Sequence, residues 1–557
     1  MILRAQLENG GSARTPLRAL KAEKRATSTS LRAVNSAQRS ARPSIAGTLA
    51  ASLLLCLLAS SCKVGPNYAT PPAKVAGQWL ETPAITNQAY SAAEEFWWRN
   101  FNDPVLDRLI DSAFRNNLSL QVAGVRILEA RAQLNRTIGN LFPQQQDLSG
   151  QVNWSRTRDN ANYTSAQLLL AASWELDFWG KFRRGIESDR ALYLQTIASY
   201  DDALVTLIAD VASTYVNIRT LDERLKVARR NLVLQRESLR IATAQFTAGE
   251  TSQRDVEQAT TQLGQTEAQI PFLEESQRQN RNGLAVLLGA TPDEIDRQLG
   301  GSGPIPAVPP KVATGIPRDL LRRRPDVRAA GLAAASKSAL IGVARAEMYP
   351  SFSLTGQFGS TGNNLAGNSL SDMFSWESRT LSAGAGFVFP ILNYGRLINQ
   401  VRVQDAQFQA AVLEYQNTVL NAQRDVEDGL TAFAKQQQAA ALLDRAAAAA
   451  RRSTALAMIQ YKGGQTDFTT VVSAEQNQLT VEDSLASTQG NVVLGIISVY
   501  RALGGGWQIR EGHDVVPDEV KAEMARRTNW GRLLEPSQHL PTTPTARGTT
   551  QANGGRR

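Results

Sequence analysis

A mixed α and β membrane protein built from two internal structural repeats is the fold class that these 557 residues indicate. Two long tracts without proline, residues 144–270 and 391–516, are typical of long helices. The two tracts match at a constant shift, since Asp210 corresponds to Asp425 and 425 − 210 = 215. Ahead of each long helix, alternating apolar and polar residues predict β-strands.

The first element is predicted to be an export signal, residues 1–61. A basic leader precedes an apolar core from Ile45 to Leu58, and the small residues Ala59, Ser60 and Ser61 lead to Cys62. This core is too short to span a bilayer, which takes about 20 residues. The alternative is a buried helix start that carries a free core cysteine.

Cys62 is the predicted lipidation site. The chain has two cysteines, and Cys56 lies inside the predicted signal, so the mature chain would begin with its one remaining cysteine. Such a cysteine fits acylation, for example by palmitate, because each buried CH₂ contributes about 0.8 kcal/mol of membrane affinity. The segment resembles a bacterial lipoprotein signal, although Ala59 and Ser61 depart from its usual Leu and Gly or Ala.

Charge and composition argue against nucleic-acid binding and enzymatic activity. The net charge is +9, but residues 1–44 carry nine Lys/Arg and two Glu, which leaves 9 − 7 = +2 for the rest. A nucleic-acid binder carries its basic patch on the folded body. The two histidines, His513 and His539, lie in the polar tail, and no phosphate loop or Cys/His cluster is present. We expect no catalytic residue, cofactor or metal site.

Two copies of a strand-and-helix unit follow the N-terminal segment. The constant shift also aligns Gly180 with Gly395 and Gly249 with Gly464, which indicates an internal duplication. The chain is expected to divide into a signal (1–61), a lipidated N-terminal and equatorial segment (62–100), a first repeat (101–300), a Pro/Gly-rich linker (301–316), a second repeat (317–506) and a partly disordered tail (507–557).

Each copy is predicted to contribute one β-hairpin, at about residues 146–179 and 351–391. Alternate residues are apolar over about ten positions, the length that crosses a bilayer at a tilt. In the two copies these residues are Ala166, Leu168, Leu170, Ala172, Trp174, Leu176 and Phe178, and Leu381, Ala383, Ala385, Phe387, Phe389 and Ile391. A soluble sheet with one face on a core is the alternative.

The hairpins are followed by helical hairpins over 181–289 and 396–503. Their turns are expected at Gly249 and Gly464, because a tight turn between helices favours a residue that adopts positive φ. The Ala-rich seams suit close antiparallel packing. A coiled-coil rod shares these helices, and only the strands distinguish it from a pore.

Four bilayer-length strands leave unpaired backbone groups at both sheet edges, and each unsatisfied group costs several kcal/mol in lipid. A closed barrel takes at least about eight strands. We therefore expect oligomers, in which two chains supply eight strands or three supply twelve. The helices would continue the closed wall as a tube.

Several stretches resemble the TolC-like outer membrane factor family, in particular the lipoprotein branch that serves resistance–nodulation–division pumps. They are "CKVGPNYATPPAKV", "YKGGQTDFTTVVSAEQNQLTVE" and "VYRALGGGWQ". The resemblance covers roughly residues 62–508. It implies a homotrimer in the outer membrane of a Gram-negative bacterium, with a twelve-stranded barrel, four strands per chain, continued by a long periplasmic α-helical barrel.

The resemblance also implies partners and a gate. The partners would be a periplasmic adaptor (membrane fusion) protein, an inner-membrane resistance–nodulation–division transporter and outer membrane lipid, in a tripartite multidrug efflux system. Tyr461 occupies the place of a gate tyrosine, and Asp467 lies nearby. Thr470 and Ser473 stand where the family often has pore-facing carboxylates, which predicts a less selective constriction. Protein secretion, metal efflux and a lipid-anchored coiled-coil protein without a pore are the alternatives.

Overall fold

The structure is a computed structural model. It describes residues 63–80, 85–86, 95–156, 162–308, 312–313, 323–364 and 369–535. The predicted signal and Cys62 lie outside the described residues, as do parts of the linker and of the tail. All described elements belong to one compact unit, Cys62–Arg557.

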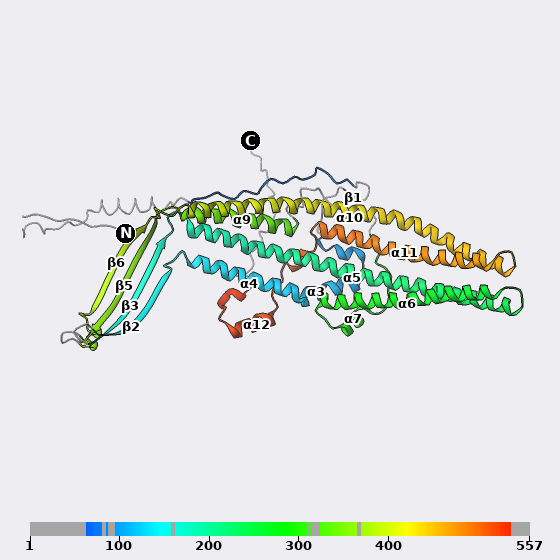
Figure 1. The fold of residues 1–557 in the computed structure, drawn as a ribbon, viewed down its shortest axis with the longest axis horizontal. Coiled ribbons are helices and arrows are strands. Elements are labelled where there is room, and N and C mark those ends of the chain that lie inside the picture. The colour runs from blue at the N-terminus through cyan, green and yellow to red at the C-terminus, as the bar shows by residue number, and fades with distance from the viewer. Residues whose placement is uncertain are drawn as a thin grey trace, which may run out of the picture. The chain divides into compact units, whose positions relative to one another are not determined.

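A four-stranded antiparallel sheet lies at one end of this unit (Figure 1). Its order is β2 (Gln145–Arg156), β3 (Asn162–Leu176), β5 (Ser351–Asn363) and β6 (Arg379–Val388). The strands have 10 to 15 residues, long enough to span a bilayer at a tilt. Within the described chain, β2 and β6 are the sheet's edges, so each has one row of backbone groups facing outward.

One face of the sheet is apolar. The register pairs Leu170 with Leu148 on β2 and with Phe358 on β5, and Phe358 pairs with Leu381 on β6, so these four side chains share a face. All four are exposed. The opposite face carries residues such as Gln167, paired with Gln151 and Thr361. The predicted period-two alternation therefore separates an apolar from a polar side.

Two helical hairpins extend away from the sheet (Figure 1). The first joins α5 (Lys181–Thr247) to α6 (Gln253–Leu288), and the second joins α10 (Arg396–Lys462) to α11 (Phe468–Ala502). α5 and α10 have 67 residues each, about 100 Å at 1.5 Å per residue. Both hairpins pack along their length, and α5 also packs on α11, so the four helices form one bundle.

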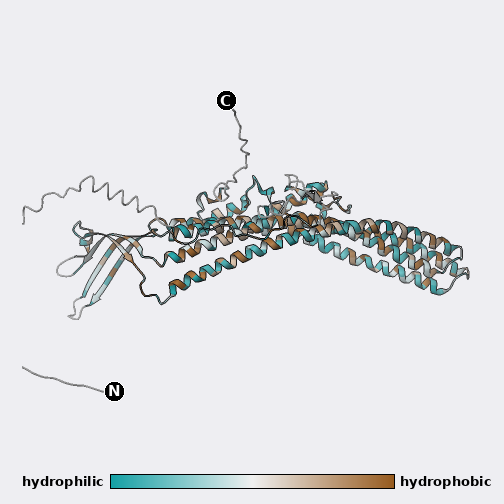
Figure 2. Ribbon diagram, turned by 90° about the horizontal axis from the view of Figure 1, so that it is seen from above, coloured by the Kyte–Doolittle hydropathy of each residue, from teal (hydrophilic) through white to brown (hydrophobic). Residues whose placement is uncertain are grey.

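Apolar and polar residues intermix along the whole bundle (Figure 2). The main core lies around its middle, where η2 (Trp97–Phe101) inserts Trp97 against Tyr500, with ring centroids 5.2 Å apart and nearly parallel. The remaining elements surround this level: α3 (Pro104–Asn116), α7 (Pro292–Leu299), α12 (Asp518–Arg527), η5 (Trp507–Arg510), η6 (Gly531–Leu534) and the parallel pair β1 (Ile85–Thr86) and β4 (Val312–Ala313).

α4 (Leu118–Gly139) and α9 (Pro325–Ala346) fill the space between this level and the sheet. Each has 22 residues; α4 packs on α5, and α9 packs on α5 and α10. Among the described helices, α9 is the one apolar and long enough to cross a membrane by composition. Its small buried residues instead lie against the neighbouring helices, as in a core helix.

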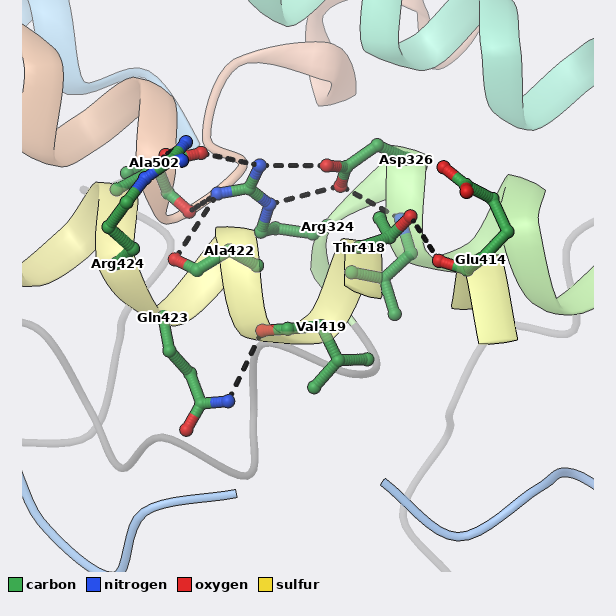
Figure 3. Close-up of polar contacts among 11 residues, drawn as sticks. Arg324, Asp326, Glu414, Thr418, Val419, Ala422, Gln423, Arg424 and Ala502 are labelled. Atoms are coloured by element: carbon green, nitrogen blue, oxygen red, sulfur yellow. Dashed lines mark hydrogen bonds and ion pairs between the residues drawn. The ribbon is translucent and has the colours of Figure 1, made fainter. Parts of the chain in front are cut away.

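Arg324 ties three helices together just before α9 (Figure 3). Its guanidinium donates to both carboxylate oxygens of Asp326, at 3.0 and 2.7 Å, and to Asp425 on α10 at 3.2 Å. It also donates to the main-chain oxygen of Ala502 at 3.0 Å, which satisfies a free carbonyl at the end of α11. Asn117, which precedes α4, donates in the same way to the oxygen of Leu287, at 2.9 Å.

A second arginine anchors the N-terminal segment. Arg184, in the first turn of α5, is almost fully buried and donates to the main-chain oxygens of Val64 and Gly65, at 3.1 and 3.2 Å. It also donates to Asn67 Oδ1 at 2.9 Å and pairs with Glu187. The described segment from Val64 to Asn67 is thereby fixed where the sheet meets the helices.

Candidate functional site at the helical hairpin tips

Both hairpins turn through a glycine with left-handed backbone. Gly249 has φ +78° and Gly464 has φ +68°. In each turn the residue after the glycine donates its N–H to a carbonyl five residues earlier, Glu250 to Gln245 and Gln465 to Gln460, both at 2.9 Å. This pairing closes the helix end as in a Schellman motif. The predicted turn glycines therefore lie at the tips.

Tyr461 lies in an apolar cluster that joins the two tips. Its side chain is 5% exposed, and its ring packs on Phe468 with centroids 5.0 Å apart. Ile241, Ala242 and Ala259 of the first hairpin join Ala457 and Val471 of the second in this cluster. Burial raises the pKa of the tyrosine hydroxyl, and the Asp255 charge adds to the rise. The predicted gate tyrosine is thus held between the hairpins within one chain.

The other three predicted gate residues point to solvent in the single chain. Asp467 is the N-cap residue of α11 and makes no side-chain cap hydrogen bond. Thr470 accepts a hydrogen bond from Thr466 at 3.0 Å. Asp467, Thr470 and Ser473 are all exposed. They occupy one end of α11, near Tyr461, without contacting its hydroxyl.

Glu475 turns inward, away from the exposed side of α11. It is 4% exposed and accepts a hydrogen bond from Ser238 on α5. Burial raises the pKa of this carboxyl, and the serine hydrogen bond opposes the rise. Gln476 beside it donates to Gln262 of α6 at 2.7 Å.

Seven residues further along, Glu482 forms a second cross-link. Its carboxylate is 4% exposed and accepts from Asn231 of α5 at 2.9 Å and from Arg451 of α10. Its neighbour Asp483 receives two hydrogen bonds from Arg224 of α5, at 2.8 and 3.0 Å. One stretch of α11 therefore holds the first hairpin through polar contacts as well as through the apolar cluster.

This arrangement is suited to separation of the hairpins rather than to catalysis. Each polar link joins side chains that water can also satisfy, so parting them exchanges hydrogen bonds instead of leaving them unmade. No group of three or more His, Cys, Asp or Glu placed to hold a metal ion occurs in the part of the chain that the structure describes.

Four residues of these contacts were not among the functional candidates predicted from the sequence: Ser238, Asn231, Arg451 and Glu482. The available signal was the seven-residue spacing of Glu475 and Glu482, which puts both carboxylates on one helical face. Their partners on α5, Ser238 and Asn231, lie more than two hundred residues away in the sequence, beyond the reach of a local pattern.

Comparison with known proteins identifies the family. The family model for outer membrane efflux proteins matches residues 109–290 and 316–505, more than half of the chain. The toluene efflux pump outer membrane protein TtgI of Pseudomonas putida is 31% identical over 475 residues, covering 82% of this chain and 97% of that protein. Nodulation protein T of Rhizobium leguminosarum bv. viciae is 30% identical over 459 residues, covering 82% and 93%.

Solved structures of outer-membrane channels are similar to this chain as well. The outer-membrane channel OprN has a TM-score of 0.75 at 32% identity, covering 80% of this chain and 100% of that chain. CusC, whose structures concern transmembrane channel formation, has a TM-score of 0.70 at 26% identity, with 80% and 100% covered. These relatives are channel and efflux proteins rather than enzymes, and their combination of long helices with a small sheet confirms the mixed α and β expectation. The chain is a member of the outer membrane efflux protein family and is located in the Gram-negative outer membrane.

Proposed function

We propose that the protein is one subunit of a gated homotrimeric duct that passively conducts substrates from the periplasm to the exterior. The observation that carries this proposal is the sheet: bilayer-length strands, an exposed apolar face and two edge strands, continuous with the 67-residue helices. In lipid those edges need partners, and copies of the same chain supply them. Three chains give a twelve-stranded barrel, and their helical hairpins give the periplasmic wall.

Equal elements in the two halves support an internal duplication. α5 and α10 have the same length, as do α4 and α9, and Asn117 and Arg324 bind the ends of the corresponding helices α6 and α11. Two similar hairpins per chain would make a trimer's wall of six near-equivalent hairpins. Because neighbouring hairpins would be nearly equivalent, they could pack side by side into a closed ring with only small differences in their contacts.

The duct would serve a tripartite system with a periplasmic adaptor and an inner-membrane resistance–nodulation–division transporter. Relatives that are outer membrane components of solvent and toluene efflux pumps support this assignment. Acylation of Cys62 would anchor the start of the mature chain in lipid. The Arg184 contacts with the segment from Val64 support this role, because they hold that segment where the sheet meets the helices.

The gate would be the tip of the second hairpin. In the closed duct, Tyr461 and the cross-links of Glu475 and Glu482 hold this tip against the first hairpin. Asp467, Thr470 and Ser473 then line the constriction. Engagement of the adaptor would separate the hairpins around the turns at Gly249 and Gly464, and the entrance would widen.

The test is single-channel conductance of the purified protein in a planar bilayer, with its oligomer mass measured alongside. We expect a trimer with small, flickering conductance. Tyr461→Ala is expected to raise the open probability, because the cluster loses its central ring. A folded monomer, or a trimer that never conducts, would contradict the proposal and favour a lipid-anchored structural protein. If the protein instead co-purifies with the adaptor of a protein-secretion or metal-efflux system, the channel would be assigned to that system.

A further inference from the structure

Residues 369–378, which precede β6, fold back onto the apolar face of the sheet. Their short turn η4 (Leu370–Phe374) packs against β3 and β5. The main-chain oxygen of Met373 accepts hydrogen bonds from Ser360 Oγ and from Ser378 Oγ, the latter at 3.0 Å. Gly362 allows this approach, because a Cβ there would lie 3.0 Å from the backbone nitrogen of Met373. The turn is therefore fixed on the strands by several contacts.

An apolar hollow of about 490 Å³ lies between this turn and the strands. Its volume is within the range of about 300–1,000 Å³ that is usual for small-molecule sites. The side chains of the strands come from the exposed apolar face, as the register of Leu170 with Leu148 and Phe358 requires. The apolar lining is made by Leu148, Leu168, Leu170, Phe358, Met373 and Phe374.

The rim of the hollow carries a cation and two exposed aromatic rings. Arg379, which also lines the hollow, places its guanidinium 4.3 Å from the ring centroid of Trp376. Phe374 and Trp376 are 77% and 76% exposed. Among the described residues, no carboxylate oxygen lies within 4.0 Å of the Arg379 guanidinium. Its charge is thus available to an anion outside the chain.

We propose that this hollow binds an acyl chain of lipopolysaccharide, with Arg379 on a lipid A phosphate. The inference rests on the proposed membrane-spanning barrel. β5 runs away from the helices and β6 returns toward them, so η4, which lies between the two strands in sequence, and Arg379, the first residue of β6, are at the end of the sheet remote from the helices (Figure 1). In that barrel this end is the outer leaflet, where lipopolysaccharide resides. Its lining matches a hydrocarbon chain, a guanidinium binds phosphate through two parallel hydrogen bonds, and exposed aromatic rings favour the membrane interface.

The test is native mass spectrometry of the full-length protein in detergent, titrated with a short rough-type lipopolysaccharide. Arg379→Gln removes the charge and is expected to weaken binding roughly tenfold, the effect of one charge-assisted hydrogen-bonded contact. The double variant Phe374→Ala and Trp376→Ala should lose binding to a similar degree. Arg379→Lys should recover part of it.

Two matched controls lie on the same apolar face outside the hollow. Arg156→Gln removes another exposed charge at the same end of the sheet, and Leu381→Ala removes another exposed apolar side chain; both should bind as the unchanged protein does. Equal losses with Arg156→Gln and Arg379→Gln would indicate general attraction and overturn the site. Equal affinity for phosphatidylglycerol, with the same sensitivity to Arg379→Gln, would overturn the lipid A assignment.

Oligomer mass and conductance are measured on the same samples. An unchanged protein that forms a conducting trimer yet binds no lipopolysaccharide would refute this inference and leave the duct intact. An unchanged protein that forms no conducting trimer would refute the duct itself, and with it the outer-leaflet placement on which the inference rests.

Discussion

Removing Arg451 tests how firmly the second hairpin holds the buried carboxylate of Glu482, which also accepts a hydrogen bond from Asn231 of the first hairpin. In Arg451→Ala the Glu482 carboxylate, which is 4% exposed, keeps one hydrogen bond from the described residues, that from Asn231. Stranding a fully buried charge costs about 3–5 kcal/mol. The side chain of Arg451 is 51% exposed, so water screens the pair and reaches the vacated site. We therefore expect a loss of about 2 kcal/mol in the free energy of unfolding.

The assay is guanidinium unfolding of the detergent-solubilised protein, followed by far-ultraviolet circular dichroism. Adding Glu482→Gln to Arg451→Ala removes the stranded charge but keeps an oxygen for Asn231, so the double variant should recover most of the loss. Arg452→Ala is the matched control, because Arg452 is exposed and makes no ion pair with the described residues. A double variant no more stable than Arg451→Ala alone would refute the reasoning.

Three further changes have defined outcomes. Glu475→Gln should raise the denaturant midpoint of unfolding at neutral pH, because burial raises the pKa of Glu475 above its unfolded value and the folded protein must then hold a buried charge. The contribution of Glu475 to stability is fully present below its unfolded pKa of about 4.3 and is lost as pH rises through its folded pKa. The gap should close in acid, and a constant gap from pH 4 to 8 would exclude this cause. Tyr461→Phe should cost at most about 1 kcal/mol, since the buried hydroxyl makes no well-formed hydrogen bond among the described residues beyond a weak interaction with Thr251, whereas Tyr461→Ala should cost about 3 kcal/mol in denaturant unfolding. Arg510→Ala should cost about 3 kcal/mol, because Asp201 is fully buried and would keep, among the described residues, only Arg328, at 3.6 Å. A lysine cannot reproduce the two hydrogen bonds of the guanidinium, so an Arg510→Lys variant as stable as the unchanged protein would contradict the bidentate role of Arg510.

The regular elements could be predicted because their signals are local. Period-two alternation indicated the strands, the absence of proline indicated the long helices, and glycine marked each turn. These signals depend on residues that are neighbours in sequence, so a single chain is enough to read them.

The orientation of the tip residues could not be predicted in the same way. The resemblance to the family places Tyr461 near a turn, but the burial of its side chain depends on Ile241 and Ala259, which belong to the other hairpin. Likewise, a helical pattern gives no reason for Glu482 to face Asn231. No periodic pattern in the sequence predicts that residues 370–374 fold back onto the sheet, because hydroxyl hydrogen bonds to a single carbonyl fix them there.

The contacts of Arg324 fix α10 at one point, so the rest of α10 can act as a lever. Asp425 is held there, and 462 − 425 = 37 residues separate it from the last residue of the helix, or about 56 Å at 1.5 Å per residue. Over that span a tilt of about 5° displaces the tip by about 5 Å, nearly the pitch of one helical turn. A small rotation of α10 about this point, with every backbone hydrogen bond of the helix kept, would therefore shift the second tip by about one helical turn.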